Sequence, residues 1–165
     1  MKNKKVGLLA ITLLSTSALA AEQGVTFSHK NWELSCDNTL TCRAAGYDNN
    51  DESAGSVRLT REGGPGTPVT GQVVVSETTS ESGEKVTQLT LWINGKSAGA
   101  LKQVDLDYWR LSSEQAATLI AQVKGSGKVE IKGGPAPFIL SGDGARAVLL
   151  KMDDVQGRLD TPGAL

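Results

Sequence analysis

NWELSCDNTLTCRAAGY, residues 31–47, contains both cysteines of the chain, six positions apart. From Trp32 to Cys36 apolar residues or cysteine alternate with polar residues, a pattern typical of a half-buried β-strand. Residues 37–39 are turn formers, so the chain can reverse there and return as a second strand. A hairpin centred on Thr39 places Cys36 opposite Cys42.

The first twenty residues indicate where the protein goes. Lys2, Lys4 and Lys5 form a basic start, Val6 to Leu14 is an uncharged and mostly apolar run, and Ala18-Leu19-Ala20 is a small-x-small sequence. This layout is typical of a secretory signal peptide, and the apolar run is about half of the ~20 residues that a membrane span needs. We expect residues 1–20 to be a signal peptide cleaved after Ala20. Residues 21–165 would then be a single periplasmic domain without a membrane anchor.

Export bears on the chemistry of the two cysteines. Opposed residues in a non-hydrogen-bonded antiparallel pair approach to about 4.5 Å between Cα atoms, which a disulfide accepts. Because disulfides persist in oxidising compartments, we predict a Cys36–Cys42 disulfide that fixes the hairpin register. A redox pair normally reads C-x-x-C, and a zinc site needs about four ligands, whereas the chain offers two cysteines and His29. We expect neither a metal nor a cofactor.

The charge balance narrows the class of partner. The full chain has 17 basic and 18 acidic residues, and removal of Lys2, Lys4 and Lys5 leaves 14 against 18, a formal charge of −4. Nucleic acids and anionic bilayers favour clustered Lys and Arg. We therefore expect no nucleic acid as partner, and instead an envelope protein or a glycan.

The remainder of the chain predicts an α+β domain. Strands are expected at 56–60, 71–77, 85–93, 96–104, 128–132 and 137–140, with a type I′ turn at Asn94-Gly95. Ser112 and Gln115 form a capping box before a helical apolar stripe, and Ser141 is expected to cap a second helix over 142–155. We predict one domain of mostly antiparallel β-sheet with two covering helices.

Two stretches carry a family resemblance. The sequence WELSCDNTLTCRAAGY at 32–47 and the ending LSGDGARAVLLKMDDVQGRLDTPGAL at 140–165 resemble a family of uncharacterised exported bacterial proteins. That family has the signature W-E-x-x-C-D-N, T-C-R-A-A-G-Y and M-D-D-x-Q-G-R. Longer members continue past D-T-P-G-A-L, so the resemblance implies that this chain is a short or truncated form. A looser similarity, to invasion-associated locus B proteins, implies a shared small periplasmic fold but no shared role.

Few residues qualify as a binding surface. Asp153, Asp154, Gln156 and Arg158 lie at or just beyond the expected end of the last helix, where acids oppose the helix dipole. An ion pair with Arg158 is the structural explanation that we favour for these acids, and a binding surface is the other. If the cysteines only hold the hairpin, Arg43 and Tyr47 are the side chains displayed beyond Cys42.

Catalytic signals are weaker still. Asp105 and Asp107 are expected to alternate on one strand and so to share a face, an arrangement that paired carboxylates use in glycoside cleavage. No assembled catalytic motif accompanies them, and we assign no catalytic residue. The sequence therefore favours a non-enzymatic binding or interaction module of the cell envelope, with a carboxylate-dependent glycan hydrolase as the alternative.

Overall fold

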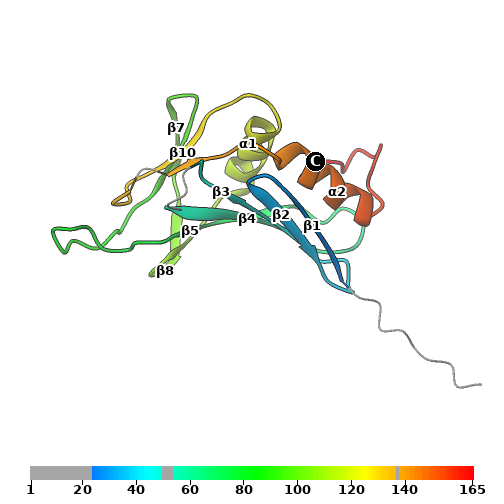
Figure 1. The fold of residues 1–165 in the computed structure, drawn as a ribbon, viewed down its shortest axis with the longest axis horizontal. Coiled ribbons are helices and arrows are strands. Elements are labelled where there is room, and N and C mark those ends of the chain that lie inside the picture. Colours follow the sequence, from blue (N-terminus) through cyan, green and yellow to red (C-terminus); the bar gives the residue numbers. More distant parts are fainter. Residues whose placement is uncertain (1–23, 50–53, 137) are drawn as a thin grey trace, which may run out of the picture.

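The computed structural model describes residues 24–49, 54–136 and 138–165, which form two antiparallel sheets and two helices (Figure 1). The predicted signal peptide lies outside the described residues. The predicted fold class, mostly antiparallel sheet with two helices in a single domain, is confirmed.

The larger sheet has seven strands in the order β1-β2-β3-β4-β5-β9-β8. These are β1 (Val25–His29), β2 (Trp32–Cys36), β3 (Cys42–Tyr47), β4 (Gly55–Arg61), β5 (Thr70–Val75), β9 (Tyr108–Arg110) and β8 (Lys102–Asp105). The first five follow one another in sequence and in space, and short turns join β1 to β2 and β2 to β3. The predicted hairpin is β2–β3, with Cys36 opposite Cys42.

The smaller sheet has four strands in the order β11-β10-β6-β7. They are β11 (Phe138–Leu140), β10 (Val129–Lys132), β6 (Thr90–Ile93) and β7 (Lys96–Ala100). The predicted turn at Asn94-Gly95 joins β6 to β7, and both turn residues have the positive φ that a type I′ turn requires. The strand expected over 85–93 is shorter than predicted, because only 90–93 pair in the sheet.

The return strand expected over 96–104 divides between the two sheets. β7 stays with β6, whereas β8 joins β9 at the edge of the larger sheet. Leu101, between them, is buried, and its N–H donates to the carbonyl of Leu89 at 2.8 Å. The chain therefore passes from one sheet to the other at this buried residue.

The helices are α1 (Ser113–Lys124) and α2 (Ala145–Val155). The capping box is present: Ser112 Oγ accepts from the Gln115 N–H, and Gln115 Oε1 accepts from the Ser112 N–H. The prediction that Ser141 caps the second helix is wrong. Gly144, with φ of 95°, is the N-cap of α2, while the Ser141 hydroxyl accepts from the Asp143 N–H in the preceding turn.

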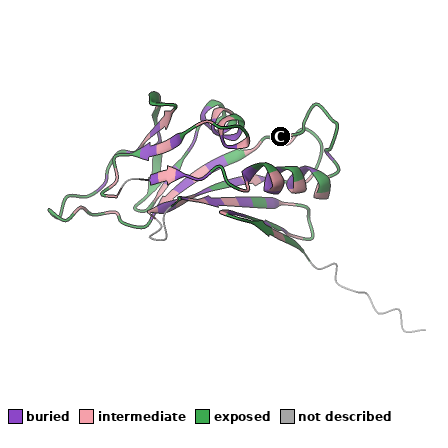
Figure 2. Ribbon diagram, turned by 45° about the horizontal axis from the view of Figure 1, so that its top comes forward, coloured by how far each residue is buried: buried purple, intermediate pink, exposed green. Residues whose placement is uncertain are grey.

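Both helices lie over the same face of the larger sheet (Figures 1 and 2). Helix α2 packs on β1, β2 and β3, and α1 packs on β5 and on strands of the smaller sheet. Along β2, β3 and β4 every second side chain is buried against this layer, as Trp32, Leu34 and Val57 illustrate. The alternate side chains point away from the helices, and we call the surface they form the open face.

Candidate functional site

The two cysteines form a disulfide, with an S–S distance of 2.04 Å and 4.0 Å between the Cα atoms. Both are almost fully buried, because Cys36 and Cys42 occupy inward positions of β2 and β3. This confirms the predicted staple of the hairpin.

A carboxylate organises the turn that the disulfide closes. Asp37 Oδ1 accepts from the N–H of Thr39 at 3.0 Å, from the Thr39 hydroxyl at 2.6 Å and from the N–H of Thr41 at 3.0 Å. The hydrogen bond from the Thr39 hydroxyl is the main reason that the pKa of Asp37 falls to about 2. Arg43 adds an exposed ion pair to Asp37 at 3.3 Å. The turn is therefore held by side-chain hydrogen bonds as well as by the disulfide.

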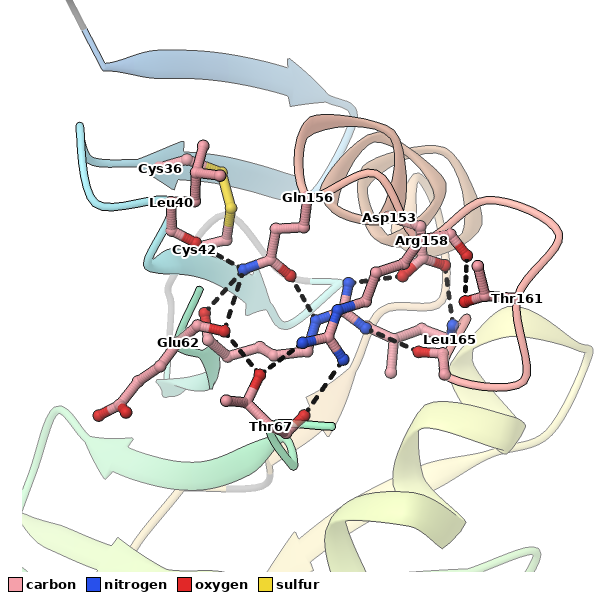
Figure 3. Close-up of polar contacts among 12 residues, drawn as sticks. Cys36, Leu40, Cys42, Glu62, Thr67, Asp153, Gln156, Arg158, Thr161 and Leu165 are labelled. Atoms are coloured by element: carbon pink, nitrogen blue, oxygen red, sulfur yellow. Dashed lines mark hydrogen bonds and ion pairs between the residues drawn. A yellow bond between two sulfur atoms is a disulfide. The ribbon is translucent and has the colours of Figure 1, made fainter. Parts of the chain in front are cut away.

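Three of the four candidate surface residues at the end of α2, Asp153, Gln156 and Arg158, belong to a mostly buried cluster (Figure 3). Asp153 is 1% exposed and forms an ion pair at 2.6 Å with Arg61 of β4, which is also 1% exposed. The predicted ion pair with Arg158 is therefore wrong. The partner of Asp153 is Arg61, an inward-pointing residue of β4 that lies 92 positions earlier in the sequence. Desolvation by burial lowers the pKa of Arg61.

Gln156 and Arg158 extend this cluster to neighbouring loops. Gln156 accepts from Arg61 Nε and donates from its amide to the carbonyls of Leu40 at 2.6 Å and Arg61 at 3.0 Å. Leu40 lies in the disulfide-closed turn, so one amide connects that turn to α2 (Figure 3).

The Arg158 guanidinium, mostly buried, donates to the carbonyls of Gly64 and Thr67 and to the Thr67 hydroxyl. Asp154, by contrast, is exposed and pairs with Lys151 at 2.6 Å. Of the four predicted residues only Asp154 is exposed, and the other three connect this end of α2 to neighbouring strands and loops.

Arg43 and Tyr47, the other predicted pair, lie on the open face. Both line a hollow of about 750 Å³ over β1 to β4. Its lining includes small side chains, Ser28, Ser35 and Ala45, beside the longer side chains of Arg43 and Tyr47. A hollow of this size is within the range of small-molecule sites.

Two further residues complete the polar wall of the hollow. The Tyr47 hydroxyl donates to Glu33 Oε1 at 2.5 Å, and this hydrogen bond is the main reason that the pKa of Tyr47 is raised. Arg58 of β4 also lines the hollow and is exposed. Among the described residues Arg58 makes no ion pair. Neither Glu33 nor Arg58 is among the site residues predicted from the sequence, although alternation along β2 and β4 assigns both to the same face as Tyr47.

The carboxylates of the alternative prediction do not lie as expected. Asp105 ends β8, and Asp107 belongs to the turn before β9, so the two do not alternate on one strand. Both are exposed. The expectation of a shared strand face fails because the chain reverses at Leu106.

The described residues contain neither a candidate metal site nor a candidate membrane-spanning helix. No group of three or more His, Cys, Asp or Glu side chains there is arranged to hold a metal ion. Neither of the helices in those ranges has the length and hydropathy of a membrane span.

Residues 26–165 match the model of a family described as "Protein of unknown function (DUF1176)", and the chain belongs to that family. No curated protein matches the chain. No solved structure matches it either.

Proposed function

We propose that this member of the family is an exported, non-enzymatic binding module of the cell envelope that engages its partner through the open face of the seven-stranded sheet. The observation that carries the proposal is the hollow of about 750 Å³ over β1 to β4, on the side of the sheet opposite the helices. A sheet face that is polar, hollowed and left without a helical layer offers contact area on a rigid framework.

Two interactions hold the strands of that face in place. The disulfide fixes β2 against β3, and the buried Arg61–Asp153 pair fixes β4 against α2. Rigid elements lower the entropy lost when a partner binds. Export agrees with the disulfide, because such bonds persist in oxidising compartments.

A photo-crosslinking residue at Ser56, which lines the hollow, tests the proposal in cells. The matched control is Ala117, exposed on α1. We expect a crosslinked product from position 56 and none from position 117. Equal yields from both positions, or none from either, would contradict the proposed binding face. Cell fractionation of the same strains tests export, since a protein confined to the cytoplasm would contradict it.

The hydrolase alternative keeps one specific test. Asp105 and Asp107 are two positions apart at an exposed turn. If purified protein released reducing ends from envelope glycans and Asp105→Asn abolished the release, the non-enzymatic proposal would be wrong. We expect no release from either protein.

A further inference from the structure

A row of cations crosses the open face. The register of β4, β5, β9 and β8 aligns Arg58 with Gln72, Gln72 with Arg110, and Arg110 with Lys102. Residues paired in this way point to the same side of a sheet. We call Arg58, Arg110 and Lys102 the basic row. Its first member lines the hollow, so the row leads from the hollow toward the far edge of the sheet.

The row is arranged against local electrostatic preference. Arg110 and Lys102 are directly opposed across β9 and β8, a placement in which like charges repel. All three cations are exposed, and among the described residues none of them takes part in an ion pair. The chain as a whole is slightly acidic, with a formal charge of −1. Three unpaired cations in one row of such a chain indicate an anionic partner.

We propose that the basic row binds the carboxylates of an acidic polysaccharide, a ligand class that rests on the binding face proposed above. Strands lie about 4.8 Å apart, so Arg58 and Arg110, two strands apart, are separated by roughly 10 Å. An extended chain with repeated carboxylates can therefore engage both. The planar guanidinium of arginine matches a carboxylate with two parallel hydrogen bonds.

The neighbouring side chains favour a glycan over a protein partner. The next row on the same face aligns Tyr47 with Ser56, Ser56 with Val74, and Val74 with Tyr108. Gln72 Nε2 donates to the Tyr108 hydroxyl at 3.3 Å. Protein interfaces place fully buried apolar anchors at their centre, whereas this row has three hydroxyls beside the Gln72 amide and one half-buried apolar side chain, Val74. Hydroxyl-rich ligands are the natural partners of such a surface.

Calorimetric titration of the purified protein with polygalacturonate tests the ligand class, with the carboxyl-reduced polymer, poly-glutamate and a single-stranded oligonucleotide as comparisons. We expect salt-sensitive binding of polygalacturonate only. Arg58→Gln and Arg110→Gln should each weaken it about tenfold or more, by loss of charge-assisted hydrogen bonds. Arg146→Gln, on exposed α2 surface, is the matched control and should bind normally.

The variants carry their own check on folding. Because Arg110 opposes Lys102, Arg110→Gln should unfold at the same denaturant concentration as the wild type or at a higher one. Absence of polygalacturonate binding, equal binding of the reduced polymer, or unchanged binding by both variants would overturn the proposal. Equal or tighter binding of poly-glutamate or oligonucleotide would also overturn the glycan class. If the polysaccharide proposal fails but crosslinking at Ser56 succeeds, the open face binds a different ligand. If crosslinking fails as well, both the ligand class and the binding face are wrong.

Discussion

Asp153→Asn tests the central role of the buried ion pair between α2 and β4. The substitution keeps the shape of the side chain but removes the charge that faces Arg61 at 2.6 Å. It also puts at risk the hydrogen bond that Asp153 Oδ2 accepts from the Leu165 N–H at 2.8 Å. Because both members of the pair are 1% exposed, the substitution leaves a cation buried without its counter-ion.

The expected loss of unfolding free energy is about 3 kcal/mol. Removing one partner of a buried pair typically costs about 3–5 kcal/mol. The lower end applies here because Arg61 keeps its hydrogen bonds to the Gln156 side chain and to the Gly163 carbonyl. Equilibrium unfolding in urea, with the disulfide intact, measures the difference at pH 7.

Two comparisons separate this explanation from others. Asp154→Asn alters the adjacent acid, which is exposed and pairs with Lys151, and should change stability by less than about 0.5 kcal/mol. The double variant Arg61→Met, Asp153→Leu removes both charges, and apolar replacement of a buried pair is often neutral. It should therefore be more stable than Asp153→Asn. A loss below about 1 kcal/mol for Asp153→Asn, or equal effects of Asp153→Asn and Asp154→Asn, would refute the reasoning.

Three further predictions concern the hairpin. Replacing Cys36 and Cys42 together by serine should lower the unfolding free energy by about 2 kcal/mol, because the disulfide closes a short loop; denaturant titration measures this, and no loss would contradict it. Asp37→Asn should destabilise the protein above pH 4 but progressively less as pH falls toward 2, because a carboxylate with a lowered pKa stabilises the fold only while ionised. Unfolding free energies of wild type and variant at pH 6 and pH 2.5 check this. The same difference between the two proteins at both pH values would contradict it. Gly46→Ala should cost about 1–3 kcal/mol, because its Cβ would meet the buried ring of Trp32; thermal unfolding checks this, and an unchanged midpoint would contradict it.

Local patterns predicted the parts of the fold that depend on neighbouring residues. The alternation from Trp32 to Cys36 and the turn formers after it were sufficient to place Cys36 opposite Cys42. The capping box at Ser112 depends on residues three positions apart, and it too was predicted correctly. Ser141 has the same local appearance of a cap, but the chain makes an extra turn through Gly144 before α2 begins.

Features that depend on the order of strands could not be predicted from local pattern. Arg61 and Asp153 are 92 positions apart, so no spacing rule connects them. Residues 96–104 read as one strand, because nothing in their composition marks the change of sheet at Leu101. The basic row is likewise assembled by pairing across four strands, and its members are too dispersed in sequence to register as a cluster.

Strand β4 carries both a structural arginine and an arginine that we propose to bind a ligand. Its two arginines, Arg58 and Arg61, are three positions apart and therefore point to opposite faces. Arg61 points toward α2 and is buried there, so its charge needs an ion-pair and hydrogen-bond partner. Asp153 supplies the ion pair and Gln156 accepts a hydrogen bond. Arg58 points to the open face, where water can solvate its guanidinium and a ligand can reach it. Replacing Arg61 by an uncharged residue should therefore lower the stability of the protein. The same replacement at Arg58 should weaken ligand binding and leave stability unchanged. A variant of Arg58 that unfolded as readily as one of Arg61 would show that the open face is part of the framework instead.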